Sequence, residues 1–573
     1  MTIKKHPKKV TAWYWAIAIS LPLVFLGGLE GILRMSDYGN DYPLFIKNPA
    51  NPNYLLPRPD IVKRYFAANA DIPSVTMEAN FLLADKPQNG FRLFVQGGST
   101  AAGFPYGLGA SLAGMLDKRL KATLPEHSVE VVNTALAAVN SFTVLDLTDE
   151  IIAQQPDAVL LYLGHNEYLG ILGVGSNYTA ANSYASTLLF LKLRSLRLFQ
   201  LLQNSYASLQ RHSTTLGTEQ TNSRTFMAKV AKHKDIPLNS DLYKAGLEQF
   251  SDNLQLILNK YQQANIPVYL ATIASNLLDQ KPFSSEPIAP EIDLALQKIK
   301  STLAAADQQQ AINLANQLAT NVDNSDNALT HFELGRLYAQ LNQAPAAKNQ
   351  LTLARDLDRL RFRAPSAINT IIRRSAAKYD NVILVEAEQH LSQFSPMDLI
   401  GNNLMLEHLH PNVRGYFLLA DSFYTALKQQ SKLTDWQSVS IEQAWAERPL
   451  LPAEEYTGFA KVLQLMNDYP FVEPNEDGTE KPLNLPPVTD WQLALGKAVF
   501  LKKIDWLSMM KECLTRYQAD NNKEMTLKTA VILADALPHD SQINQYVAQL
   551  YTQQNSASLA NYYTQRSALA KAR

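Results

Sequence analysis

Four groups of polar residues in this 573-residue chain could together perform acyl transfer, three of them directly after short apolar runs and the fourth further beyond the last such run. Ser99 follows FRLFVQGG, where two glycines let the backbone turn sharply and present the hydroxyl. Asn166, in GHNE, supplies a side-chain amide, and the small-residue loop NTALAAVNS supplies backbone N–H groups. Glu407 and His410, in EHLHPN, place a carboxylate three residues before an imidazole. Each feature alone is compatible with a turn, a helix cap or a surface histidine, whereas the ordered set indicates a catalytic site.

These residue types predict a serine nucleophile assisted by a histidine base. Serine is a weak nucleophile at its own pKa, so a base must take its proton during the attack. We expect His410 to be that base, with Glu407 fixing the tautomer of the ring and stabilising the imidazolium. His408 is the alternative base, but the carboxylate three residues upstream favours His410.

Short apolar runs that alternate with helical segments predict the elements that position these residues. Such runs, separated by helices, indicate a parallel sheet covered on both faces. Open α/β sheets keep their sites at the carboxyl ends of the strands, which is where Ser99 and Asn166 fall. The runs are FRLFVQG at 91–97, VEVVN at 129–133, DAVLLYLG at 157–164, PVYLATI at 267–273 and NVILVEA at 381–387.

The order of the motifs resembles the SGNH, or GDSL-type, hydrolase family. That family has a serine after the first strand, a glycine-containing loop after the second, G-x-N-D after the third and D-x-x-H near the end of the domain. The resemblance covers residues 91 to about 430, apart from a helical insertion, and it implies a flavodoxin-like three-layer α/β/α fold and ester hydrolysis. It also implies catalytic Ser99, His410 and Glu407. The implied oxyanion hole consists of the Ser99 and Ala138 backbone N–H groups and the Asn166 side-chain amide.

Three positions depart from the family pattern. Ala138 stands where the family usually has glycine, which keeps the backbone donor but makes the wall bulkier. Glu167 replaces the aspartate after Asn166, at a position that we expect to be structural. Glu407 replaces the aspartate of the triad, and glutamate takes that role in other serine hydrolases.

Composition excludes several other kinds of chemistry. A net charge of -1 gives no reason to expect a nucleic-acid partner. The single cysteine, Cys513, excludes an internal disulfide framework and a thiolate metal cluster. We find no His/Cys/Asp cluster with metal-ligand spacing and no phosphate-binding glycine-rich loop, so we expect neither a metal nor a cofactor.

The N-terminal 35 residues predict a membrane anchor. MTIKKHPKKV carries four lysines and no acid, and the 17 residues from Trp13 to Leu29 are uncharged. At about 1.5 Å per residue this run reaches roughly 25 Å, the short end of a membrane span. The lysines place the N-terminus in the cytoplasm and the rest of the chain outside the cytoplasmic membrane. A cleaved signal peptide is the alternative, but the apolar run is long and no A-x-A-like cleavage site follows it before Glu30.

The remaining segments read as a lead-in, a helical insertion and a helical C-terminal region. In the insertion, the spacing of a TPR unit is followed by Leu334, Gly335, Tyr338, Ala347 and Ala354. The alternative interpretation is that the insertion is a packing insert or a lid over the site. In the tail, WQLALGKAVFLKKIDWLSMMKECLTRYQ reads as a helix. The predicted divisions are 1–35 anchor, 36–90 lead-in, 91–284 hydrolase domain, first part, 285–362 TPR-like insertion, 363–430 hydrolase domain, second part, and 431–573 helical C-terminal region.

These observations predict a membrane-anchored serine hydrolase of the cell envelope that acts on carboxylic esters. The expected substrate is an acylated envelope glycan or lipid, with a small acyl group on a glycan favoured. QGGSTAAGFPYG and YLGHNEYLGILGVGS resemble a membrane-anchored bacterial subgroup of the family that also carries TPR-like helices. The alternatives are an acyltransferase that uses the same site, and a scaffold whose helical regions recruit an envelope protein.

Overall fold

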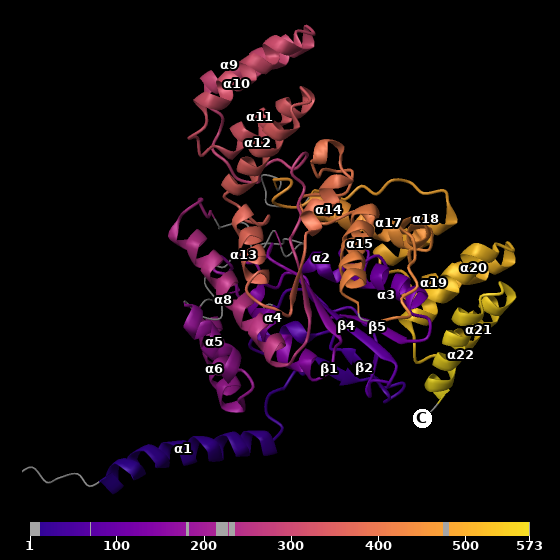
Figure 1. Ribbon diagram of the computed structural model, residues 1–573. Helices are drawn as coiled ribbons and strands as arrows, with labels where there is room; N and C mark the ends of the chain where they lie inside the picture. The colour runs from indigo at the N-terminus through magenta and orange to yellow at the C-terminus, as the bar shows by residue number, and fades with distance from the viewer. Residues whose placement is uncertain are drawn as a thin grey trace, which may run out of the picture. The chain divides into compact units, whose positions relative to one another are not determined.

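The computed structural model describes residues 12–68, 70, 72–178, 183–213, 227, 235–431, 433–473 and 481–571 (Figure 1). The lysines of residues 1–10 lie outside the described residues. The chain divides into two compact units, which are described separately below. The first unit comprises Met1–Pro43, Asp60–Pro73 and Ala180–Gln220, and the second comprises Leu44–Pro59, Ser74–Thr179 and Thr221–Arg573.

The second unit is built on a five-stranded parallel sheet, which confirms the five predicted strands. Their apolar residues are buried because helices cover both faces of the sheet; all five residues of AVLLY, for example, are buried. The strand order is β5-β4-β6-β7-β8, so the first strand has its successors on opposite sides. Such a reversal opens a crevice at the carboxyl ends of β4 and β6. The strands are β4 (Gly90–Gly97), β5 (Ser128–Asn133), β6 (Ala158–Tyr162), β7 (Val268–Ala271) and β8 (Val382–Val385).

Helices form a layer on each side of this sheet (Figure 1). One layer contains α4 (Ser141–Ile152), α8 (Asp241–Gln263) and α13 (Ser366–Ala376), with α8 packed on each of the other two. The other contains α3 (Leu112–Thr123), α14 (Ala387–Gln393) and α15 (Val413–Gln430). The short α2 (Ser99–Ala102) follows β4 directly. The predicted three-layer arrangement is therefore present.

The lead-in contains a small antiparallel sheet that the sequence did not predict. Its strands, β1 (Phe45–Lys47), β2 (Tyr54–Pro57) and β3 (Leu82–Leu83), have only two to four residues, too short to show an alternating pattern. β3 is held to the parallel sheet by side chains: Glu130 accepts a hydrogen bond from the Leu83 N–H (2.6 Å), and Arg92 donates to the Leu83 carbonyl (2.7 Å). The 3-10 helix η1 (Ile61–Tyr65) lies in the first unit.

The insertion between β7 and β8 is helical, as predicted. Its four helices are α9 (Pro290–Ala304), α10 (Gln308–Asn321), α11 (Ala328–Gln340) and α12 (Ala344–Leu357), and they share one apolar core. α11 and α12 approach closely at Gly335, where a Cβ atom would lie 2.7 Å from the Leu351 side chain. A further 3-10 turn, η2 (Pro396–Asp398), precedes the loop that carries His410.

The C-terminal region is also helical, but the long helix predicted from Trp491 is wrong at its centre. Lys502 adopts a left-handed φ of 55°, and the Asp505 side chain accepts the Ser508 N–H (2.7 Å) as a new N-cap. The helix therefore divides into α18 and α19. The helices of this region are α16 (Ile441–Ala446), α17 (Pro452–Met466), α18 (Trp491–Phe500), α19 (Trp506–Ala519), α20 (Lys523–Ala536), α21 (Ser541–Gln553) and α22 (Ala557–Lys571).

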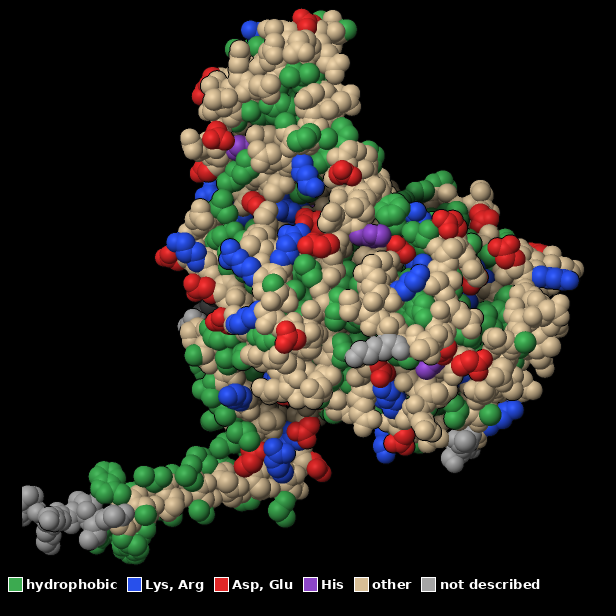
Figure 2. Space-filling model, in the orientation of Figure 1, with side chains coloured by type: hydrophobic (Ala, Val, Ile, Leu, Met, Phe, Trp, Pro, Cys, Tyr) green, Lys and Arg blue, Asp and Glu red, His purple; other side chains and the backbone are tan. Residues whose placement is uncertain are grey.

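The first unit contains α1 (Ala12–Met35), α5 (Tyr184–Leu193) and α6 (Arg197–Ser213). Within α1, residues 13–35 are long and apolar enough to cross a membrane, and their apolar window is not buried. Figure 2 shows hydrophobic side chains along this helix. A soluble helix would bury such residues, so α1 is a candidate membrane span.

Candidate active site

Ser99 lies at a sharp turn between β4 and α2, half-buried at the carboxyl end of the sheet. Two glycines permit this turn. A Cβ atom on Gly97 would lie 2.0 Å from the Tyr162 carbonyl oxygen of the neighbouring strand, and one on Gly98 would lie 2.9 Å from Asn166 Nδ2. The GG of the motif is therefore required by close approach of β6 and of the loop that follows it.

His410 contacts both of its predicted partners. Its Nε2 lies 2.8 Å from Ser99 Oγ, and its Nδ1 contacts Glu407 Oε1. The same carboxylate accepts the His410 backbone N–H at 2.9 Å and the His408 backbone N–H at 2.7 Å. Glu407 is thereby held in one orientation. With Nδ1 facing a carboxylate, Nδ1 carries the proton and Nε2 can accept one from serine.

Surrounding elements hold the loop that carries His410. The His410 carbonyl accepts the Leu406 N–H (2.8 Å), and the His408 carbonyl accepts the Asn276 N–H (2.9 Å) from the loop after β7. Asn412 caps α15 by accepting the Gly415 N–H at 3.0 Å. These bonds fix the histidine in the crevice at the end of the sheet.

The segment after Ser99 is tied to the same loop. Tyr416, in α15, donates a hydrogen bond to the Phe104 carbonyl at 2.6 Å. The Phe104 ring lies 4.7 Å from the His410 ring, measured between centroids. The spacing of the motifs did not indicate Phe104, because its contacts with Tyr416 and His410 join segments about three hundred residues apart.

His408, the alternative base, contacts Glu407 through its Nδ1 and lies in an aromatic cluster. Its ring contacts those of Phe283, Phe362 and Phe471, with centroids 5.3, 6.0 and 5.5 Å away. Burial lowers the pKa of His408 well below its usual value. The geometry brings His410, and not His408, to Ser99.

Burial also lowers the pKa of His410, to about 3. The His410 ring is therefore neutral at neutral pH and available as a proton acceptor. The Glu407 carboxylate on Nδ1 is placed to stabilise the imidazolium that forms when the ring takes a proton.

A small hollow beside Ser99 carries the side-chain amide predicted for the oxyanion hole. It has a volume of about 10 Å³ and is lined by Gly98, Ser99, Thr100, Val139, Tyr162, Gly164, His165 and Asn166. Asn166 is half-buried, with its Nδ2 against Gly98. Ala138 is not among the lining residues, although it directly precedes Val139.

Ala138 adopts a left-handed backbone with φ of 64°. Its carbonyl accepts the Ile171 N–H at 2.7 Å, which joins its loop to the segment after β6. The left-handed region costs an alanine roughly 1 kcal/mol relative to glycine. The glycine expected at this place by resemblance is thus explained by backbone conformation.

The chain is similar to solved structures of a lipase and of two esterases. No family model and no curated protein matches it. It is similar to a GDSL-like lipase from Parabacteroides merdae, with 10% identity and a TM-score of 0.29 over 60% of this chain and 99% of the lipase. It is also similar to the acetyl xylan esterase AlAXEase (13% identity, TM-score 0.27, 59% of this chain and 100% of the esterase). A catalytic mutant of Axe2, an acetylxylan esterase from Geobacillus stearothermophilus, matches at 13% identity and a TM-score of 0.28 over 62% of this chain and 100% of Axe2.

Glu167 is buried and holds the loops around the site. Its carboxylate accepts hydrogen bonds from the Ser141 hydroxyl (2.8 Å), the Ser141 N–H (3.1 Å) and the Gln249 amide (2.5 Å). It thus joins the start of α4 to α8. Burial raises the pKa of Glu167 to about 7.

His165 is a site residue that the sequence analysis did not single out. Its ring lines the hollow, its Nε2 lies 3.2 Å from the Ala274 carbonyl, and its Nδ1 accepts the Ala364 N–H at 3.2 Å. These partners require the tautomer with the proton on Nε2. Burial lowers its pKa to about 3, so the ring stays neutral.

The folded chain brings together a group of possible metal ligands that the sequence spacing did not indicate. Glu407, His408 and His410 bring possible ligand atoms within 4.8 Å of one another, although their sequence spacing gave no metal motif. In the present arrangement both ring nitrogens of His410 already have protein partners, Glu407 and Ser99. A metal at this cluster would have to displace one of them.

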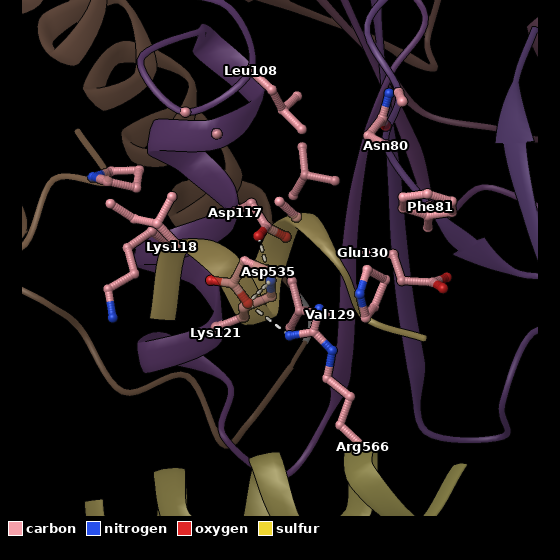
Figure 3. A pocket seen from close by; sticks show the side chains of 18 of the residues that line it. Asn80, Phe81, Leu108, Asp117, Lys118, Lys121, Val129, Glu130, Asp535 and Arg566 are labelled. Atoms are coloured by element: carbon pink, nitrogen blue, oxygen red, sulfur yellow. Dashed lines mark hydrogen bonds and ion pairs between the residues drawn. The ribbon is translucent and has the colours of Figure 1, made fainter. Parts of the chain in front are cut away.

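A separate cavity of about 760 Å³ lies elsewhere in the second unit, and neither Ser99 nor His410 lines it. Figure 3 shows Lys121, Asp535 and Arg566 meeting at its wall. Asp535 accepts hydrogen bonds from Lys121 (2.9 Å) and Arg566 (2.6 Å), and Lys121 also contacts Asp117. Because these residues lie on α3, α20 and α22, the ion network connects the C-terminal helices to the sheet layers.

Proposed function

We propose that this protein is a membrane-anchored serine hydrolase of the SGNH type that acts on carboxylic esters of the cell envelope. The observation that carries the proposal is the 2.8 Å contact between His410 Nε2 and Ser99 Oγ, with Glu407 on the other ring nitrogen. Ser99 and His410 lie some three hundred residues apart in the sequence. A hydroxyl, an imidazole and a buried carboxylate in this order form a nucleophile, its base and the group that orients the base.

In the proposed reaction, Ser99 Oγ attacks the ester carbonyl carbon as His410 Nε2 takes its proton. The tetrahedral intermediate then collapses, and His410 gives the proton to the leaving alcohol. Water attacks the resulting acyl-enzyme with His410 again as base, which releases the acid and restores Ser99. Glu407 stabilises the imidazolium in both steps.

The negative charge on the intermediate needs hydrogen-bond donors. We assign this role to the backbone N–H groups of Ser99 and Ala138 and to the Asn166 side-chain amide. The position of the amide in the hollow beside Ser99 supports its inclusion. Each such donor lowers the barrier by about 3 kcal/mol.

The hollow has the room of roughly one water-sized group, which suits a single oxygen of the intermediate. For the substrate we propose an acetyl or similarly short ester on an envelope glycan, because the N-terminal anchor would hold the site near the envelope. The anchor is proposed to cross the inner membrane once, with the N-terminus cytoplasmic and the hydrolase domain periplasmic or extracellular.

The test is hydrolysis of p-nitrophenyl esters by the detergent-solubilised full chain and by its Ser99→Ala variant. Wild type should hydrolyse the acetyl ester fastest, with rates falling as the acyl chain lengthens. Ser99→Ala should lose this activity and also lose covalent labelling by a fluorophosphonate probe. Equal rates for the two proteins would remove the enzyme claim, and a preference for long chains would overturn the small-acyl assignment.

Two alternatives use other features of the chain. An acyltransferase would use the same site with a sugar hydroxyl in place of water, and product analysis with a glycan acceptor distinguishes it from a hydrolase. A scaffold would use the helical insertion, in which α11 and α12 approach closely at Gly335. The scaffold would be favoured if a strain with Ser99→Ala has the wild-type phenotype while deletion of the insertion causes a defect.

A further inference from the structure

The beginning of α6 is fixed to the end of the candidate membrane span. Glu30, near the C-terminal end of α1, accepts the backbone N–H groups of Arg197 (3.0 Å) and Leu198 (2.8 Å), the first residues of α6. Arg34 donates to Glu30 (2.8 Å) and to the Ser195 carbonyl (3.0 Å). A carboxylate of one helix thus caps the other, so α6 is held at the depth of Glu30.

That depth is the membrane surface if α1 crosses the bilayer. The uncharged run that ends at Leu29 reaches roughly 25 Å, about the thickness of the hydrocarbon core, so Glu30 comes at its edge. In Figure 1, α6 crosses the direction of α1 rather than continuing along it. A helix that starts at the interface and runs across the span lies along the surface.

The polar side of α6 is occupied by the segment that follows α1. Gln200 donates to the Asn40 carbonyl at 2.8 Å, and Asn204 donates to the Tyr38 hydroxyl at 3.1 Å. Asn204 also accepts the Ala68 N–H at 2.9 Å. Four residues apart, Gln200 and Asn204 share one face of the helix, so these bonds set which face α6 turns outward.

The outward face carries large apolar side chains. Leu202, Tyr206 and Leu209 are 61%, 64% and 71% exposed, and their spacing of four and three residues puts them on one stripe. Leu189 of α5 is 54% exposed. In Figure 2, hydrophobic side chains gather where Figure 1 places α5 and α6. Water is a poor environment for such a stripe, whereas the boundary of the acyl chains is a favourable one.

The charge of this stretch fits an anionic surface. Between Glu167 and Glu219 the sequence contains no acidic residue, but it contains Lys192, Arg194, Arg197 and Arg211. Arg197 pairs with Asp41 (2.9 Å), while Lys192 is exposed. A stretch of sequence with large apolar residues, several cations and no acid is typical of helices that lie in the interface of membranes with anionic lipids.

We infer that α5 and α6 form a membrane-surface element, which inserts the stripe of Leu202, Tyr206 and Leu209 into the acyl-chain boundary of an anionic bilayer beside α1. The inference rests on the membrane anchor of the proposed function. Its consequence is that the first unit is held by the bilayer at two places, the span and the surface helix. A surface helix fixed to the end of the span restricts the tilt of that span in the bilayer.

The test uses spin labels on the full chain reconstituted in phosphatidylglycerol-containing vesicles. In a Cys513→Ala background, single labels are placed by Leu202→Cys, by Val24→Cys in the span and by Gln309→Cys on exposed α10 as the aqueous control. Collision with oxygen and with a water-soluble nickel chelate reports depth. The Leu202 label should lie about 5–10 Å below the headgroups, the Val24 label deeper, and the Gln309 label in water.

Each contrary result overturns a defined part of the inference. A Leu202 label in water with Val24 in lipid would leave the anchor standing and refute the surface helix. Val24 in water would refute both. Protection of Leu202 from both reagents, with dipolar broadening between labels, would show that a second copy covers the stripe. An unchanged depth in purely phosphatidylcholine vesicles would refute the role given to the cations.

Discussion

Gly98→Ala should inactivate the site without unfolding the protein. Gly98 has φ of -90° and ψ of -156°, an extended conformation that alanine also adopts, so the substitution brings no backbone strain. Its new Cβ atom, however, would lie 2.9 Å from Asn166 Nδ2. The Gly98 backbone is held in place, because its carbonyl accepts the N–H of Ala102 in α2 (2.9 Å). The Asn166 amide must therefore move.

The magnitude follows from what that movement removes. A displacement of a few tenths of an ångström or more takes the amide out of its position toward the developing oxyanion. Complete loss of one oxyanion donor lowers kcat by about 10²–10³-fold, or about 2.7–4 kcal/mol. We expect Asn166→Ala to show that full loss and Gly98→Ala to approach it. KM should change little in both, because the donor acts mainly on the transition state.

A double-mutant cycle tests this explanation with a short-chain ester as substrate. If alanine at 98 acts by displacing Asn166, Gly98→Ala/Asn166→Ala should be no slower than Asn166→Ala alone. Thermal unfolding of all four proteins serves as the control for stability. Multiplied losses in the double mutant, or full activity of Gly98→Ala, would refute the placement of Asn166 in the oxyanion hole.

Glu407→Gln should lower kcat by about 10⁴-fold with the fold intact, because an amide favours the wrong tautomer of His410. Glu407→Asp should lower kcat by about 10-fold to 100-fold. Near-full activity of Glu407→Gln would indicate that the site works as a Ser–His pair. Treatment with EDTA should leave ester hydrolysis unchanged, since both nitrogens of His410 have protein partners, and a loss restored by one divalent metal would assign the cluster to that metal. Ala138→Gly should leave the free energy of unfolding in urea within about 1 kcal/mol of wild type or raise it, because glycine relieves the left-handed φ. The control Ala137→Gly should lower that free energy by about 0.5–1 kcal/mol. Equal losses of stability in the two variants would contradict this prediction. Glu167 binds its proton more tightly in the folded chain than in the unfolded one, so it should make stability fall by on the order of 3 kcal/mol as pH rises from about 4 to 8. Urea titrations across this range should show a shallower decline for Glu167→Gln, and parallel declines would argue against a raised pKa.

The parallel sheet could be predicted because its signal is local. Each strand is a short apolar run bounded by turn residues, and burial on both faces requires such a run. The candidate triad was accessible for the same reason. Ser99 immediately follows a strand, and Glu407 and His410 are close enough in sequence to share one loop. The meeting of that loop with Ser99 follows from the convergence of strand ends at one edge of the sheet.

The features that were not predicted depend on contacts between distant segments or on very short elements. β1, β2 and β3 are too short to carry a period, and β3 is held by the side chains of Glu130 and Arg92. His165 takes its tautomer from carbonyl and amide groups more than a hundred residues away. The break between α18 and α19 did have a local signal, since Asp505 is a good N-cap residue. The helical pattern on either side of it concealed that signal.

The contacts of His408 explain how a large insertion can interrupt the sheet without disturbing the site. Phe283 and Phe362 lie just before and just after the four inserted helices, and both contact the His408 ring. Asp358 closes the stem between them by accepting the Phe283 and Ser284 N–H groups at 2.9 and 3.0 Å. The aromatic cluster around His408, whose Nδ1 contacts Glu407, is therefore built in part from the two ends of the insertion. Because Asp358 joins those ends to each other, the cluster is held together at the base of the four inserted helices.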